Sequence, residues 1–102
     1  MNKLVRLSES ELQGRLSEMP AWHLRADQLS RSFEFSDFVE AFGFMTSVAL
    51  VSERLGHHPN WSNVYNRVEI ALSTHEVDGI SDNDLLLAAM IDQIFLKARP
   101  DL

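Results

Sequence analysis

The short stretch from Gly56 to Trp61, which reads GHHPNW, carries the side chains best suited to chemistry in this chain. His57 and His58 are adjacent there, and with His75 they make up three of the four histidines. An imidazole changes charge near neutral pH, so it can donate or accept a proton, and it is also a common metal ligand. The pair therefore allows three interpretations: a polar loop, half of a metal site, or a group for acid–base catalysis.

The residues on either side of the pair argue against a shared metal ion. Gly56 is a natural end for a preceding helix, because glycine accepts the left-handed conformation found there. Pro59 disfavours the helical region for His58 and holds it extended. Adjacent extended residues point to opposite sides, so the rings of His57 and His58 are not expected to face the same ion.

Two alternatives to acid–base catalysis use the same residues. A metal-dependent hydrolase would bring histidines and a carboxylate together on one ion. Its candidate ligands are His57, His58 and His75 with Glu76 or Asp84. A purely structural interpretation makes the histidines surface or helix-capping groups, makes Asp84 a partner of a helix N-terminus, and leaves Glu53 solvated.

Composition places these side chains in a small acidic domain without cysteine. The length of 102 residues fits a single domain over 1–102, with 45% hydrophobic and 24% charged residues, as in ordinary globular proteins. The net charge of −6 argues against a basic face for nucleic acid. No apolar stretch is long enough to span a bilayer, so we expect no membrane partner. The lack of cysteine excludes disulfides and thiolate nucleophiles and fits a cytoplasmic location.

The hydrophobic pattern changes period along the chain and predicts the elements that position the histidines. A capped amphipathic helix is followed by a hairpin with its turn at Asp27 and Gln28, then by a long helix opened by Ser36 and Asp37. A second hairpin and a last helix beginning at Ser81 complete the chain. The prediction is an α+β domain, in the order α-β-β-α-β-β-α, with a four-stranded antiparallel sheet and three helices packed on one face. The predicted ranges are 8–19, 22–35, 36–56, 61–64, 68–73 and 81–96.

Both long helices carry apolar faces. In the first, one face at helical spacing is predicted to enter the core. Its members are Phe38, Ala41, Phe42, Met45, Val48, Ala49 and Ser52. In the last helix, residues 85–96 are apolar over more than one face. One face can cover the sheet, and the other suits a subunit interface, because monomers rarely expose so large an apolar patch. We therefore expect a homodimer or homotetramer.

The spacing of the whole set resembles the pterin-4a-carbinolamine dehydratases. The family pattern has an acidic or polar residue, a His-His-Pro step, an aromatic residue, a later histidine and a downstream aspartate. The segment HHPNWSNVYNRVEIALSTHEVDGIS looks like the family's core, and the resemblance extends over nearly the whole chain. The matching residues here are Glu53, His57, His58, Pro59, Trp61, Tyr65, His75 and Asp84.

The resemblance implies an α+β fold and the dehydration of 4a-hydroxytetrahydropterin to quinonoid dihydropterin, in tetrahydropterin recycling, with a pterin as substrate and neither metal nor cofactor. It makes His57 and His75 catalytic and His58 a catalytic or substrate-binding histidine. Glu53 and Asp84 would orient histidines through hydrogen bonds. The residues implied to line the pterin pocket are His58, Pro59, Trp61, Ser73, Thr74, His75 and Glu76.

A non-catalytic interaction protein on the same scaffold is the second hypothesis. Some members of the family act as scaffolds or assembly factors after losing catalytic histidines, and animal members serve as dimerisation cofactors for a transcription factor. This chain keeps the histidines, which favours the enzyme.

Overall fold

The structure, a computed structural model, describes residues 4–98, so residues 1–3 and 99–102 of the predicted domain lie outside the described part. The predicted α+β class and element order are confirmed. The elements are α1 (Glu9–Leu16), β1 (His23–Arg25), β2 (Gln28–Glu34), α2 (Phe38–Leu55), β3 (Asn60–Val64), β4 (Arg67–Leu72), a short 3-10 turn η1 (His75–Val77) and α3 (Asp82–Lys97).

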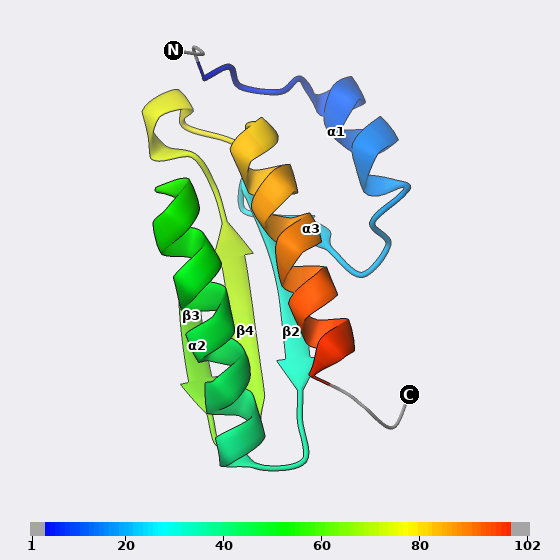
Figure 1. The fold of residues 1–102 in the computed structure, drawn as a ribbon. Coiled ribbons are helices and arrows are strands. Elements are labelled where there is room, and N and C mark those ends of the chain that lie inside the picture. The colour runs from blue at the N-terminus through cyan, green and yellow to red at the C-terminus, as the bar shows by residue number, and fades with distance from the viewer. Residues whose placement is uncertain (1–3, 99–102) are drawn as a thin grey trace.

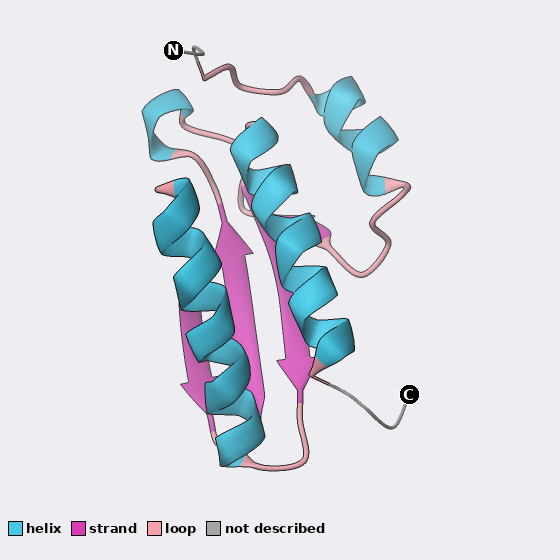
Figure 2. Cartoon of the chain, viewed as in Figure 1, coloured by secondary structure: helices cyan, strands magenta, loops and turns pink. Residues whose placement is uncertain are grey.

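The four strands form one antiparallel sheet in the order β1-β2-β4-β3 (Figure 2). Each hairpin turns on residues with positive φ: Ala26 and Asp27 between β1 and β2, and Tyr65 between β3 and β4. The first turn lies one residue earlier than predicted, because Gln28 already pairs with Arg25 in the ladder.

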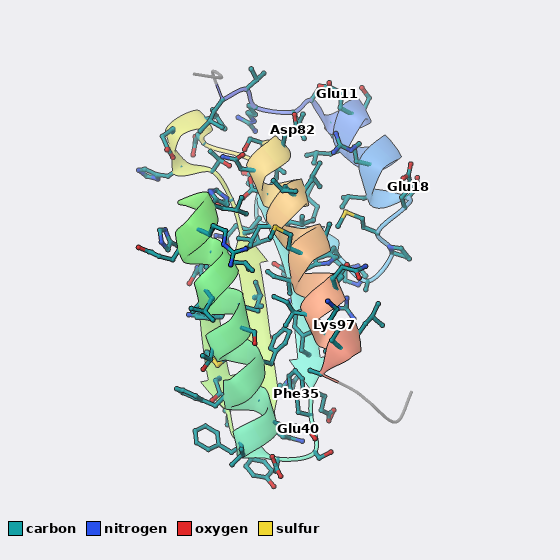
Figure 3. The ribbon with its side chains drawn as sticks, in the orientation of Figure 1. Glu11, Glu18, Phe35, Glu40, Asp82 and Lys97 are labelled. Carbon is teal, nitrogen blue, oxygen red and sulfur yellow. The ribbon has the colours of Figure 1, made fainter. Side chains whose placement is uncertain are left out.

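The helices α2 and α3 run antiparallel over the same face of the sheet (Figure 1). Figure 3 shows this direction through labelled side chains, with Glu40 near the start of α2 and Lys97 near the end of α3 at one end of the molecule. Asp82, at the start of α3, lies at the other end. Within residues 4–98, no helix combines the length and the apolar character needed to cross a membrane.

The first helix lies beside the N-terminal end of α3 (Figure 1). It begins as predicted, because Ser8 and Glu11 form a reciprocal capping box. It ends at Leu16, earlier than the predicted Met19, since the last residues of that range form turns instead. Leu12 reaches the core, and Arg15 donates from Nη1 to Oδ1 of Asp82 at 3.1 Å.

The core lies between the sheet and its two covering helices. Alternate residues of β4, Val68, Ile70 and Leu72, are at most 2% exposed, as their alternation with exposed positions predicts. Phe33 of β2 packs against Phe44 of α2 with ring centroids 4.9 Å apart. These contacts hold α2 against the sheet.

The predicted core face of α2 is wrong in part. The buried residues of this helix are Ala41, Phe44, Val48 and Ser52. Phe38 and Phe42, predicted to be inside, are 47% and 54% exposed, and Ala49, also predicted to be inside, is exposed as well. The helix is rotated so that Phe44 enters the aromatic cluster around Phe33, which turns the Phe38–Phe42 side toward solvent.

Candidate active site

Three segments that are distant in sequence meet at one end of the molecule. They are the loop after α2, the loop after β4, and the N-terminal end of α3 (Figure 1). Hydrogen bonds among His57, Thr74 and Asp84 join one residue from each segment. This junction brings together His57, Asp84 and the loop that carries His75, which the sequence pattern had singled out.

His57 is held against a fully buried carboxylate. Its Nε2 lies 2.6 Å from Oδ1 of Asp84, and the exposed fractions of the two side chains are 12% and 0%. The backbone N–H of His57 donates to the carbonyl of Ser52 in the last turn of α2 at 3.1 Å. Gly56, which ends that helix with φ 69°, has the left-handed conformation predicted for it. The imidazole is therefore fixed at both its backbone and its ring.

Asp84 owes its position to the start of α3. Ser81 caps this helix, and Asp84 is the third helical residue, whose side chain bonds back to the cap in a capping box. Its Oδ2 accepts the backbone N–H of Ser81 at 2.9 Å and the hydroxyl of Thr74 at 2.7 Å. Both carboxylate oxygens thus have protein partners, as a buried charge requires.

His58 faces a different environment from its neighbour. Its Nε2 lies 2.9 Å from Oε1 of Glu53, and the exposed fractions of the two side chains are 63% and 82%. His57 turns inward and His58 outward, as the extended geometry before Pro59 predicts. The two imidazoles therefore face separate carboxylates, one buried and one solvated.

The loop after β4 presents His75 and Glu76 to solvent. Its ends are tied by the N–H of Thr74, which donates to the carbonyl of Gly79 at 2.7 Å, and by a bridge between the same residues. His75 opens the short turn η1, and both His75 and Glu76 are exposed. The side chain of Thr74 differs from these two, because the residue is only 1% exposed. The loop thus offers an imidazole and a carboxylate outward while anchoring itself through Thr74.

The remaining residues implied for the pocket are half-buried. Pro59 and Ser73 flank the junction at the start of β3 and the end of β4. Trp61 pairs with Ile70 across the ladder and packs against the hydrophobic core. Much of the indole therefore serves the fold, and its remaining surface is what a ligand can contact.

Within the described residues, no three side chains of the metal-binding types gather closely enough to hold an ion. The ligand set considered for a metal-dependent hydrolase, which combined His57, His58 and His75 with Glu76 or Asp84, is thus not assembled. The acid–base interpretation needs no such convergence.

From the sequence, Ser81 is predicted only to start a helix, and its place beside Asp84 is a finding of the structure. The available signal was the Ser-x-x-Asp spacing of a capping box, which puts the aspartate oxygen on the backbone N–H of the serine. What the spacing does not reveal is that Thr74 and His57 converge on the same carboxylate.

Comparisons with known proteins identify relatives over most of the chain. Residues 5–94 match the family model described as pterin 4 alpha carbinolamine dehydratase. A protein of Burkholderia multivorans, provisionally named pterin-4-alpha-carbinolamine dehydratase, is 46% identical over 97 residues, covering 93% of this chain and 95% of its own. A provisionally named dehydratase of Synechococcus sp. is 51% identical over 88 residues, covering 86% of this chain and 95% of its own.

Two solved structures share the fold. The crystal structure of a transcriptional coactivator/pterin dehydratase from Brucella melitensis has a TM-score of 0.86 at 41% identity, covering 89% of this chain and 99% of that one. A pterin dehydratase-like protein identified as a RuBisCO assembly factor has a TM-score of 0.64 at 23% identity, covering 72% of this chain and 88% of that one. At that identity the second likeness concerns the fold alone.

Proposed function

Because the chain belongs to the pterin-4a-carbinolamine dehydratase family, we propose that it removes water from 4a-hydroxytetrahydropterin and forms quinonoid dihydropterin. The proton on N5 leaves, and the hydroxyl on C4a departs with an added proton as water. No electrons are exchanged with another molecule, so the protein has to supply only proton transfer and orientation.

The observation that carries this proposal is the pairing of His57 with Asp84 at 2.6 Å. A buried carboxylate against one ring nitrogen orients an imidazole and fixes which nitrogen carries the hydrogen, which suits the ring to general acid–base catalysis. Within this proposal Asp84 acts through His57 and does not touch the pterin.

His75 is the second proton-transfer group in this proposal. It stands exposed on the loop after β4, and that loop is bonded through Thr74 to the carboxylate that holds His57. One of the two histidines protonates the departing hydroxyl while the other takes the N5 proton. His58, with Glu53 at 2.9 Å, contributes a polar contact at the rim of the site.

Binding of the flat pterin ring falls to the groups around the two histidines. Glu76 lies beside His75 and offers a carboxylate to the N–H groups on the amide-like edge of the ring. The accessible surfaces of Pro59, Ser73 and Trp61 complete the proposed contacts.

Stopped-flow absorbance of freshly generated 4a-hydroxytetrahydropterin tests the function. Native protein should accelerate its decay, and His57→Ala and His75→Ala should each lose most of the acceleration, about 10²-fold or more. His23→Ala is the matched control, because this exposed histidine lies in β1 outside the junction. Well-folded native protein that left the decay unchanged would rule the proposal out.

We also propose that the chain assembles with copies of itself through α2. Large apolar side chains stand exposed along this helix: Phe38, Val39, Phe42 and Leu50, at 47%, 78%, 54% and 64%. The last helix, where the sequence pattern predicted the interface, exposes Leu86 and Leu96. The rings of Phe38 and Phe42 lie 5.7 Å apart and form a continuous apolar surface of the kind that interfaces bury.

Sedimentation velocity tests the assembly. Native protein should sediment as a dimer or tetramer, and Phe42→Glu should shift it to smaller species. Val64→Glu is the control, because Val64 is 75% exposed but belongs to β3. A native monomer would contradict this proposal, and with it the alternative of a non-catalytic dimerisation protein.

The cytoplasmic location stays a prediction.

A further inference from the structure

We infer that the hydroxyls of Thr74 and Ser81 form a positioning relay that fixes the tautomer of His57 and makes Nδ1 the ring atom that exchanges protons. That the proton is exchanged with a pterin substrate rests on the proposed function. The relay itself rests on hydrogen bonds among Thr74, Ser81 and Asp84.

The direction of each hydrogen bond in the relay follows from which groups can donate a hydrogen and which can only accept one. An ionised carboxylate only accepts, so the single hydroxyl hydrogen of Thr74 goes to Oδ2 of Asp84, at 2.7 Å. At its contact with Ser81, where the two hydroxyl oxygens lie 2.6 Å apart, Thr74 must then accept and Ser81 donate. The hydroxyl oxygen of Ser81 in turn accepts the N–H of Asn83 at 3.3 Å.

The relay therefore runs in one direction, from the N-terminal end of α3 to the carboxylate. Hydrogen bonds in such a chain polarise one another, and the N-terminal end of a helix favours negative charge. Oδ2 also accepts the backbone N–H of Ser81 at 2.9 Å, so this oxygen receives two donors. Both donors direct a hydrogen at this oxygen, so it acts only as an acceptor.

Burial makes the relay hard to replace. Thr74 and Ser81 are each 1% exposed and Asp84 is 0% exposed. Bulk water does not reach these atoms, so solvent does not replace the hydrogen bond that a missing hydroxyl made. Thr74 was implied by the family resemblance to bind substrate, but its hydroxyl is already engaged on both sides. Its side chain is therefore assigned to positioning.

The consequence for His57 is a choice between its two neutral tautomers. With Oδ2 occupied by donors, Oδ1 of Asp84 accepts from Nε2–H of His57 at 2.6 Å. The ring hydrogen then sits on Nε2, and Nδ1 carries the free lone pair. Within residues 4–98, Nδ1 makes no hydrogen bond and is not among the buried unpartnered polar atoms, so it reaches solvent.

Removing the Thr74 hydroxyl should weaken the preference for the tautomer with hydrogen on Nε2 of His57. In Thr74→Val the carboxylate loses a donor while the side-chain shape is kept. A protonated Asp84 would donate to Nε2 and move the ring hydrogen to Nδ1, which is the wrong tautomer for accepting a proton there. Thr74→Ser is the matched control, since it keeps the hydroxyl and removes only a methyl group.

The test is ¹⁵N NMR of the imidazole nitrogens in protein labelled on histidine, recorded where the His57 ring is neutral. Native protein and Thr74→Ser should show hydrogen on Nε2 and a bare Nδ1. Thr74→Val should show a second population with hydrogen on Nδ1. In the dehydration assay its kcat should fall by about 10- to 100-fold, with KM changed less than about threefold, because the loss concerns the proton-transfer step.

Two results would overturn the relay: Thr74→Val that keeps the native tautomer, or native protein that carries the hydrogen on Nδ1. Should Thr74→Val fail to fold, Thr74→Ala applies the same test, because it removes the same donor to Oδ2 of Asp84 and keeps the backbone N–H of Ser81 on that oxygen. The NMR readout needs no substrate. A shifted tautomer in Thr74→Val with an inactive native protein would therefore support the relay and refute the proposed function.

Discussion

Replacing Asp84 by asparagine reverses one hydrogen bond and leaves the shape of the site unchanged. The amide oxygen can take the place of Oδ2 and still accept from Thr74 and Ser81, at the present distances of 2.7 and 2.9 Å. The amide NH₂ then faces Nε2 of His57, where Oδ1 now stands. A neutral His57 must accept there and hold its hydrogen on Nδ1, and a protonated His57 loses its counter-charge.

The size of the effect follows from the bond that is lost. Hydrogen bonds to charged groups contribute about 1.5–3 kcal/mol net, and the upper part of this range applies here, because the carboxylate is 0% exposed. The opposed tautomer adds about 1 kcal/mol more, the usual net worth of a neutral hydrogen bond. A total of about 3–4 kcal/mol corresponds to a loss of about 10²- to 10³-fold in kcat.

Stopped-flow dehydration of 4a-hydroxytetrahydropterin measures this loss directly. Asp82→Asn is the control, because Asp82 lies in the same first turn of α3 but its side chain is 74% exposed and pairs with Arg15 at the surface. The control should stay within about twofold of native, as expected for an exposed pair. An Asp84→Asn enzyme that retained native kcat would refute the idea that this carboxylate orients a catalytic histidine.

Two further predictions concern helix ends and stability. The pKa of Glu11 is lowered, first by the backbone N–H of Ser8 and then by its hydroxyl. The stability that Glu11 gives α1 is therefore present above its unfolded pKa and is lost as pH falls through its folded pKa. Hydrogen-exchange protection at the start of α1 should fall with pH in this acid range, and Glu11→Gln should remove that dependence. Gly56→Ala should lower the free energy of unfolding, measured in urea, by about 1 kcal/mol, because φ is 69° there. Gly43→Ala, inside α2 with open space for a methyl group, should raise it by up to about 1 kcal/mol. Changes of the same sign in the two variants would contradict the assigned conformations.

Much of the fold could be predicted because local chemistry and hydrophobic period agree. Ser8 and Glu11 fit a capping box, Gly56 fits a helix end, and the alternation of Val68, Ile70 and Leu72 fits a strand with one buried face. The rotation of α2 could not be predicted in the same way. Apolar residues at helical spacing occur on two overlapping faces of this helix, and only the position of Phe44 against the sheet decides which one is buried.

The candidate site could likewise be predicted from the sequence only in part. Pro59 predicts that His57 and His58 diverge, but it does not say which ring turns inward. That depends on Asp84, which lies 27 residues further along and is brought to His57 by the sheet and by the start of α3. The part played by Thr74 and Ser81 was equally hidden, because a hydroxyl's partner is set by tertiary structure and not by spacing alone.

The most direct test of the whole account is the decay of 4a-hydroxytetrahydropterin with native protein present far below the substrate concentration. We expect many turnovers per chain, with a rate proportional to protein concentration and quinonoid dihydropterin as the product. Decay at the uncatalysed rate, in the presence of folded protein with its His57–Asp84 pair intact, would contradict it.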